Sequence, residues 1–306
     1  MPIWALAPIA WALMAQPAAK EPTMGAEGFH LATNVYSWSV FYGREGRDFN
    51  ADPDKGLADI VASGLDGLET IAETPEDADR IGAALKKHGL GMRSLYVNST
   101  LHIAAEADKS IVRITAIAAR AKAYGTRIIV TNPNPIQWGG VQDKDDAQLT
   151  AQSAAMNRLG KALKELGMTL AYHNHDPEMR ASAREFHHMM AGTDPALVKL
   201  CLDAHWIYRG AGNSQVALFD IVKLYGARVA ELHLRQSRGG VWAEDFGEGD
   251  LDYPRLAAAL RALKLHPHVV LEQAVEQGTP ETLDPVEAHR RSAAYARPLL
   301  EGIGAK

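Results

Sequence analysis

From Phe29 to the end of the chain, short apolar runs rich in β-branched residues alternate with longer segments whose apolar residues recur at the helical period. The short runs predict eight strands, at 30–37, 64–70, 92–99, 126–132, 168–174, 198–203, 228–236 and 268–273. The longer segments predict eight helices, at 54–64, 75–89, 109–125, 146–167, 181–192, 214–226, 253–265 and 285–300. The regular alternation indicates repeated strand–helix units.

Residues that start and stop helices support these boundaries. Thr74 before Pro75 and Asp284 before Pro285 are typical of helix N-termini. Four glycines follow predicted helices, where a left-handed residue commonly ends the helix: Gly64, Gly89, Gly125 and Gly167.

Eight strands alternating with eight helices over about 270 residues predict a single (β/α)8 TIM barrel, over residues 29–306. An open, doubly wound parallel sheet is the alternative. It is disfavoured because no G-x-G-x-x-G turn, the usual phosphate-binding device of such sheets, follows the first strand.

Composition and charge exclude several partners. The 306 residues are 47% hydrophobic and 23% charged, with a formal net charge of −5 and both signs interspersed. Nucleic acid and anionic membrane surfaces require a positive field, so neither is expected as the main partner. The single cysteine, Cys201, precludes a disulfide within the chain and is expected to be a buried thiol. The sequence leaves a homo-oligomer open.

The N-terminus differs from the rest of the chain. Residues 1–22 carry no charge before Lys20, and their apolar part ends in small residues, which predicts a signal peptide with a short linker. The protein is then periplasmic or secreted. Basic residues at the very start are missing, and a misassigned start would make the protein cytoplasmic. No later stretch is apolar for long enough to span a membrane.

Ionisable residues end several of the predicted strands with inward-facing parity. Catalytic groups of a parallel barrel lie at the C-terminal ends of its strands, where alternate side chains face the interior. His173, Asp203, His233 and Glu272 are therefore expected to converge from four successive strands. Two imidazoles and two carboxylates suit one divalent metal ion, Mn²⁺, Zn²⁺, Co²⁺ or Fe²⁺, with Mg²⁺ less favoured by the nitrogens.

Other polar residues are weaker candidates for catalytic roles. His175 shares the face of His173, Glu69 ends the second strand, and Glu178 lies in a segment that turns the chain toward the next helix. Glu231 lies deeper than the other strand-end residues and is expected to pair with Lys199 as a structural contact.

Substrate-binding candidates also lie near strand ends. Arg235 and Asn132 are expected to contact substrate. Trp206, Trp242 and Trp38 could form an apolar surface against which a sugar ring packs, or they could simply pack at the barrel rim.

From Phe29 onward the chain resembles the sugar phosphate isomerase/epimerase superfamily, the xylose isomerase-like TIM barrels. The resembling segments are "LATNVYSW", "GLDGLET", "YHNHDPE", "CLDAHW", "ELHLRQS", "DFGEGDLDYPRL" and "VVLEQ". The resemblance implies one divalent metal held by His173, Asp203, His233 and Glu272. In the superfamily's epimerases the ligand on the fifth strand is usually glutamate, whereas this chain has His173.

The resemblance and the ligand set together predict proton abstraction next to a carbonyl of a keto-sugar or keto-glycoside, through an enediolate. Glu272 is the expected base, and Arg235 would neutralise a substrate oxygen or a phosphate. Export favours an unphosphorylated substrate. An epimerase needs a second group on the opposite face, for which His175, Glu178 and Glu69 are the candidates.

Three alternatives stay open. Isomerisation or β-elimination, as in the superfamily's inosose dehydratases, needs its acid and base on one face only. A metal-dependent phosphodiesterase of the endonuclease branch would be expected to carry further histidines at strands two and three, where this chain has Glu69, Asn98 and, in the following loop, His102. A sugar-binding protein without catalysis would keep the tryptophans.

Overall fold

The computed structural model describes residues 29–304 as a ring of eight parallel strands, which confirms the predicted barrel. The strands run in the order β2-β1-β10-β7-β6-β5-β4-β3, and isolated bridges join Gly67 to Gly91 and Ile71 to Tyr96 between β2 and β3. Their bounds are β1 Leu31–Asn34, β2 Gly67–Glu69, β3 Ser94–Tyr96, β4 Ile128–Thr131, β5 Thr169–His173, β6 Val198–Asp203, β7 Val229–Leu234 and β10 His268–Leu271. The predicted signal peptide, residues 1–22, lies outside the described residues.

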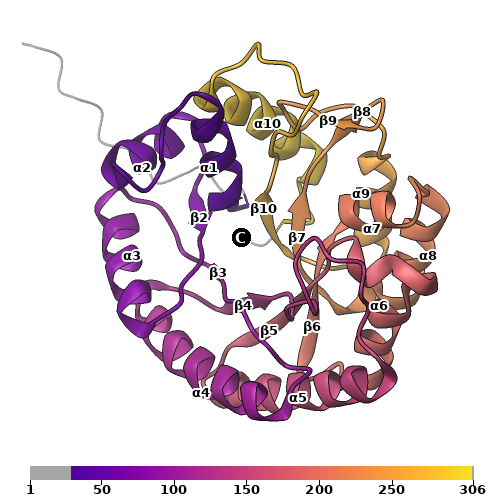
Figure 1. Cartoon of the computed structure of the whole chain (residues 1–306). Helices are drawn as coiled ribbons and strands as arrows, with labels where there is room; N and C mark the ends of the chain where they lie inside the picture. Colours follow the sequence, from indigo (N-terminus) through magenta and orange to yellow (C-terminus); the bar gives the residue numbers. More distant parts are fainter. Residues whose placement is uncertain (1–28, 305–306) are drawn as a thin grey trace, which may run out of the picture.

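The helices form an outer layer around the strands (Figure 1). Eight of them match the predicted helices: α2 Pro53–Ala62, α3 Pro75–Lys87, α4 Ala104–Ala121, α5 Asp146–Glu165, α6 Arg180–Gly192, α8 Gln215–Tyr225, α9 Tyr253–Ala262 and α10 Pro285–Leu300. Short 3-10 turns lie at η1 Lys122–Tyr124, η2 Pro177–Met179 and η3 Gly226–Arg228. No helix among residues 29–304 is long and apolar enough to cross a membrane.

The predicted helix boundaries are confirmed by their caps. The side chains of Thr74 and Asp284 accept the backbone N–H of Asp77 and Glu287, respectively. Gly64, Gly89, Gly125 and Gly167 all have φ between 71° and 96°, the left-handed conformation that a glycine adopts without strain.

Three elements differ from the sequence prediction. The first strand stops at Asn34, whose side chain accepts the N–H of Tyr36 and starts helix α1, Val35–Arg44, inside the range predicted as strand. Asp203 caps a second unpredicted helix, α7 Ala204–Gly210. A hairpin of β8 Ser237–Arg238 and β9 Val241–Trp242 follows β7. A capping side chain, Asn34 or Asp203, ends the strand before each helix, and Gly239 and Gly240 turn the hairpin with positive φ.

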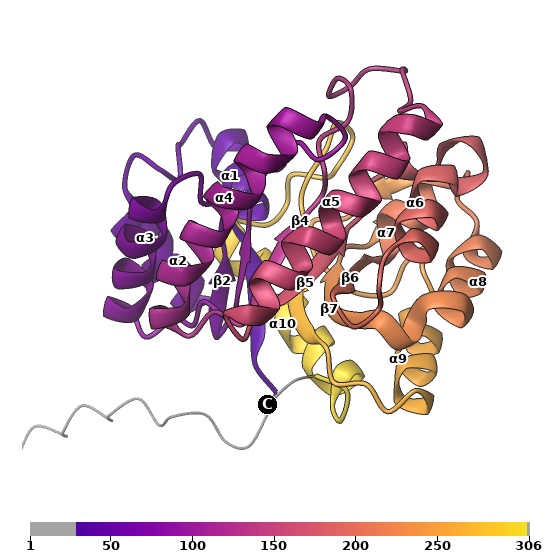
Figure 2. The ribbon, with the colours of Figure 1, turned by 90° about the horizontal axis from the view of Figure 1, so that it is seen from below.

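The barrel interior is apolar only across a thin layer. Tyr96, Val130, Ala171 and Cys201 form this cluster, and the thiol of Cys201 is buried and free as predicted. The larger apolar core lies between the strands and the helices. Figure 2 shows the loops that follow the strands on the upper side of the molecule. Polar side chains fill the barrel above the thin apolar layer, on that side.

Candidate active site

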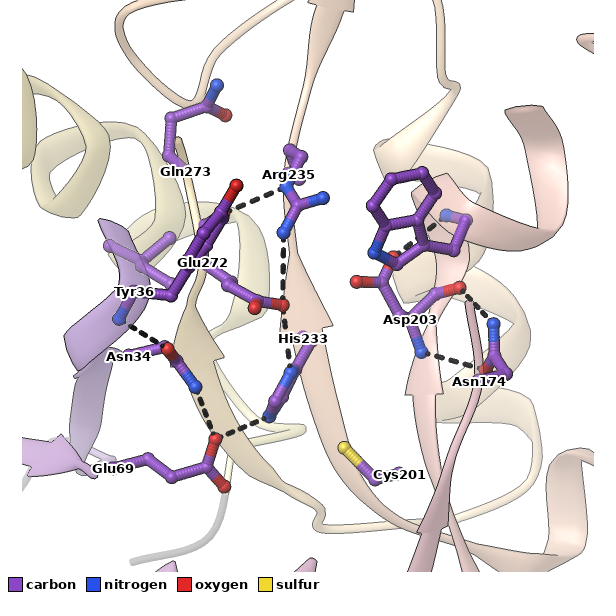
Figure 3. Close-up of polar contacts among 12 residues, drawn as sticks. Asn34, Tyr36, Glu69, Asn174, Cys201, Asp203, His233, Arg235, Glu272 and Gln273 are labelled. Carbon is purple, nitrogen blue, oxygen red and sulfur yellow. Dashed lines mark hydrogen bonds and ion pairs between the residues drawn. The ribbon is translucent and has the colours of Figure 1, made fainter. Parts of the chain in front are cut away.

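The four predicted metal ligands lie together at the C-terminal ends of β5, β6, β7 and β10. Potential ligand atoms of His173, Asp203, His233 and Glu272 all lie within 4.8 Å of one another, and all four side chains are buried. Strand register produces this arrangement, because β7 pairs His233 with Asp203 on one side and with Val270 on the other. Figure 3 shows Asp203 across from His233 and Glu272.

Two atoms of this cluster are buried without a hydrogen-bond partner: His173 Nδ1 and Asp203 Oδ2. The other carboxylate oxygen of Asp203 accepts the N–H of Trp206 at 2.9 Å. The side chain of Asn174 donates to the backbone oxygen of Asp203 and accepts its backbone N–H. A buried polar atom without a partner is costly, and a cation held by these atoms would remove that cost. The residues therefore fit a divalent metal ion.

The pKa values of His173 and Glu272 favour coordination, whereas the raised pKa values of Asp203 and His233 mean that these two residues release protons when a metal binds. Burial, with the neighbouring His175, lowers the pKa of His173 well below its ordinary value, so the imidazole is neutral and free to coordinate. Burial raises the pKa of Asp203 to about 7. Burial would also raise the pKa of Glu272, but Arg235 and His233 hold it well below its usual range.

His233 is held between carboxyl groups from both sides. Its Nδ1 lies 3.0 Å from Glu272 Oε2, and its Nε2 lies 3.1 Å from Glu69 Oε1 (Figure 3). Nε2 also lies 3.1 Å from Glu231 Oε1. An imidazole that donates Nε2–H to a carboxylate is oriented to offer Nδ1 to a metal. The predicted pairing of Glu231 with Lys199 is wrong. In the described part of the chain, Glu231 instead contacts His233 and lies 3.9 Å from Cys201 Sγ.

Arg235 covers the cluster from the next inward-facing position of its strand. Its Nε donates to Glu272 O at 3.0 Å, and its Nη2 lies 3.2 Å from Glu272 Oε2. The guanidinium stacks 4.1 Å from the Trp242 ring centroid and 5.1 Å from that of Trp206. Nη1 is buried with no partner and is thus a donor available to a ligand.

A cavity of about 530 Å³ opens above these residues. Five of the predicted site residues line it: His173, His175, Trp206, Arg235 and Glu272. Its remaining wall comes mainly from loops after β1 to β5, through Asn34, Tyr36, Ile71, Tyr96, Asn98, Trp138, Gly139, Gly140, Asp176, Pro177 and Arg180. The sequence reasoning missed these residues. Aromatic residues close to predicted strand ends, such as Tyr36 and Tyr96, were the available signal.

His175 lies at the cavity between two tryptophans. Its ring centroid is 5.5 Å from that of Trp138 and 5.6 Å from that of Trp206. Burial lowers its pKa to about 4, so the ring is neutral near pH 7 and can exchange hydrogen bonds with a substrate.

The other predicted site residues do not line this cavity. Glu69 lies beneath His233 and accepts Asn34 Nδ2 at 2.7 Å. Glu178 Oε2 accepts the N–H of His175 at 2.6 Å, and Asn132 Nδ2 donates to His173 O at 2.9 Å. Both therefore brace the strand that carries the histidines.

The tryptophans divide in the same way. Trp206 lines the cavity, whereas Trp242 lies beneath Arg235. Trp38 stacks on His289, with 4.1 Å between ring centroids, and packs between α1 and α10 as part of the core.

A nearly closed eight-stranded barrel with candidate metal ligands at its strand ends defines a TIM barrel with an enzyme-like site. The chain belongs to the xylose isomerase-like TIM barrel family, whose model matches residues 57–299.

Curated relatives and solved structures are consistent with this family. Inosose dehydratase of Mesomycoplasma hyopneumoniae strain 7448 is 24% identical over 275 residues, covering 81% of this chain and 88% of that protein. A sugar phosphate isomerase/epimerase from Parabacteroides distasonis superposes with a TM-score of 0.70 at 18% identity, covering 93% of this chain and 100% of that one. A 3-keto-D-glucoside 4-epimerase from E. coli superposes with a TM-score of 0.61 at 16% identity, covering 88% and 99%.

Proposed function

We propose that this protein is a metal-dependent enzyme that moves a proton next to the carbonyl of a keto-sugar or keto-glycoside, as an isomerase or epimerase acting through an enediolate. The observation that carries the proposal is the convergence of His173, Asp203, His233 and Glu272 beneath a cavity that Arg235 borders. The sugar-converting relatives and neighbours support the same class of reaction.

His173, Asp203, Glu272 and Nδ1 of His233 would hold the metal, which when bound supplies Lewis-acid polarisation of the substrate carbonyl. Glu272 is the base. Its pKa is held well below the usual range by Arg235 and His233, against the effect of burial, so it is a carboxylate at neutral pH. It accepts the proton from the carbon next to the carbonyl. Arg235 Nη1 donates to the oxygen on which negative charge develops.

A second candidate is a lyase of the dehydratase type on the same residues. Glu272 is the one glutamate that borders the cavity in the described part of the chain. Histidine stands where the superfamily's epimerases usually have a second glutamate, which removes a ready base from the opposite face. Elimination of water needs an acid and a base on one face of the substrate only. The curated relative of this chain described above is named inosose dehydratase, which is an enzyme of this type.

The phosphodiesterase alternative is less well supported. The histidine at the expected loop, His102, is buried and belongs to none of the possible metal-binding groups among residues 29–304. Each of those groups contains His233 and lies in the barrel interior.

The proposal is tested by metal analysis of the purified protein, followed by solvent-deuterium incorporation into a panel of keto-sugars and keto-glycosides. Bound divalent metal with deuterium at the carbon next to the carbonyl is the expected result. Loss of water in the same assay identifies the lyase. Metal without exchange or elimination in any member of the panel would overturn the proposal and leave the sugar-binding alternative.

A further inference from the structure

A second cavity, of about 670 Å³, adjoins the reaction cavity. Asn98 and Trp138 line both, so the two share a border. The second cavity lies over the loops that follow β2, β3 and β4 and over the first turns of α4. We call it the outer groove. Its other lining residues are Glu73, Ser99, Thr100, Glu106, Lys109, Ser110, Arg113 and Asn134.

The polar groups of the outer groove are held in place by one another. Arg113 Nη1 lies 2.9 Å from Glu73 Oε2, and Arg113 Nη2 donates to Asn98 O. Asn98 in turn donates to Glu73 Oε1. Asn134 Nδ2 donates to Thr100 Oγ1 at 3.1 Å, while Asn134 Oδ1 is buried without a partner. The groove thus presents a fixed polar surface.

Each cation that lines the two cavities lies beside a carboxylate. In the outer groove, Arg113 pairs with Glu73, and Lys109 pairs with Glu106 at 2.8 Å. In the reaction cavity, Arg235 pairs with Glu272. Arg180, the remaining cation there, has Nε 2.9 Å from Asp143 Oδ1. Every Lys or Arg that lines either cavity in the described part of the chain therefore has a carboxylate partner. This arrangement suits a neutral, hydroxyl-rich ligand better than a phosphorylated one.

Trp138 stands at the border between the cavities with 54% of its surface exposed. An exposed aromatic ring flanked by amide and hydroxyl side chains offers a flat apolar face together with hydrogen bonds. A sugar ring has this same combination of an apolar face and a polar edge.

We infer that the outer groove binds the second ring of a glycoside whose oxidised ring reacts over Glu272, so that the substrate is an unphosphorylated keto-disaccharide or a similar keto-glycoside. This inference rests on the proposed function. The side chain of Asn134 hydrogen-bonds a hydroxyl of the second ring, and Trp138 packs against the linkage between the two rings. An unphosphorylated substrate also agrees with the export predicted from residues 1–22, which stays a prediction.

The test compares two probes with the metal-loaded protein: a methyl keto-glucoside, and the keto-disaccharide in which a glucose replaces the methyl group, in both anomeric forms. Solvent-deuterium exchange is measured for each. We expect kcat/KM to be about tenfold higher for one of the disaccharides, equal to about 1.4 kcal/mol. Asn134→Ala and Trp138→Ala should each reduce this ratio of disaccharide to methyl glucoside toward one.

Asn157→Ala is the matched control, because Asn157 bonds Gly192 and Asp194 through a similar amide away from the groove. It should keep the wild-type ratio. Trp138 is half exposed, so its replacement tests the groove even if Asn134→Ala lowers the melting temperature.

The outcomes separate this inference from the proposed function. If both probes exchange but the ratio of their kcat/KM values is near one, or if neither groove variant alters that ratio, the outer groove does not bind a second ring. The proposed reaction then still stands. Faster turnover of a phosphorylated ketose would overturn it as well. If neither probe exchanges, the full panel of keto-sugars and keto-glycosides decides the proposed reaction, and calorimetric binding of the two probes decides the groove. Tighter disaccharide binding that Asn134→Ala abolishes supports the groove, and equal binding rejects it.

Discussion

His233 turns its Nε2 atom toward Glu69, 3.1 Å from Oε1, and both side chains are completely buried. Asn34 Nδ2 donates to the same carboxylate oxygen at 2.7 Å, which links β1, β2 and β7 beneath the candidate metal ligands. The direction of Nδ1 toward Glu272 therefore depends on a carboxylate three strands away around the barrel.

We expect Glu69→Gln to lower the affinity for Mn²⁺ by about ten- to one hundredfold, because a carboxylate on the far nitrogen orients a ligating imidazole and raises its basicity. Equilibrium dialysis against Mn²⁺ measures the change. Glu281→Gln, at an exposed position after β10, is the control. Unaltered affinity in Glu69→Gln would mean that Glu231 alone orients His233.

Replacement of Glu272 by Gln should reduce deuterium exchange by at least about a hundredfold, because the amide cannot accept the substrate proton. The fold should be largely retained, since the side chain ends a strand and borders the cavity. Exchange kinetics and circular dichroism provide the two readouts. Near-normal turnover with intact structure would remove Glu272 from the role of base.

His173→Ala is expected to lower the metal content of the purified protein well below one ion per chain. The imidazole supplies one of four converging ligands, and its buried Nδ1 has no protein partner. Elemental analysis after gel filtration gives the stoichiometry. His266→Ala, at an exposed site, should bind metal like the wild type. Full occupancy in His173→Ala would exclude this residue as a ligand.

Metal affinity should rise with pH and continue to rise above pH 7. Burial raises the pKa of Asp203 to about 7, so below that pH the metal must displace a proton. His173 and Glu272 have lowered pKa values and are already in their ligating forms there. Against the effect of burial, Cys201, Glu69 and Glu272 raise the pKa of His233 well above its ordinary value, so the metal must displace a proton from His233 too. The affinity should therefore rise by about tenfold per pH unit just above pH 7 and more steeply below it. Titrations with Mn²⁺ across this range test it, and a flat profile would contradict the assignment of Asp203.

Two glycines should respond in opposite ways to alanine. A Cβ on Gly160 in α5 would lie 2.5 Å from Leu197 O, so Gly160→Ala should destabilise the fold by about 1–3 kcal/mol. A Cβ on Gly43 in α1 meets nothing within 4 Å, and Gly43→Ala should stabilise by about 0.5–1 kcal/mol. Urea unfolding compares them. If the two substitutions changed the free energy of unfolding equally, α5 would be able to shift away from Leu197.

The barrel and the convergence of the four candidate ligands could be predicted from the sequence because both depend on periodicity. Alternation along a strand places His173, Asp203, His233 and Glu272 on one face, and the C-terminal ends of parallel strands meet at one end of the barrel.

The residues that form the remaining wall of the cavity could not be predicted. Their positions depend on where the chain leaves each strand, and periodicity does not encode that point. The turn at Asn34 brings Tyr36 to the cavity, and the loop after β4 brings Trp138 there. Glu69 has inward parity, as predicted, yet it lies one layer too deep to reach the cavity. Parity gives the direction of a side chain, whereas its depth follows from the stagger of neighbouring strands.

The pairing of every lining cation with a carboxylate also has a kinetic consequence. Arg113, Lys109, Arg180 and Arg235 contribute little net field at the mouth of the barrel, because each has a negative partner within 3.2 Å. A neutral sugar is not steered by long-range electrostatic forces. Capture of the proposed sugar substrate should therefore be nearly insensitive to ionic strength.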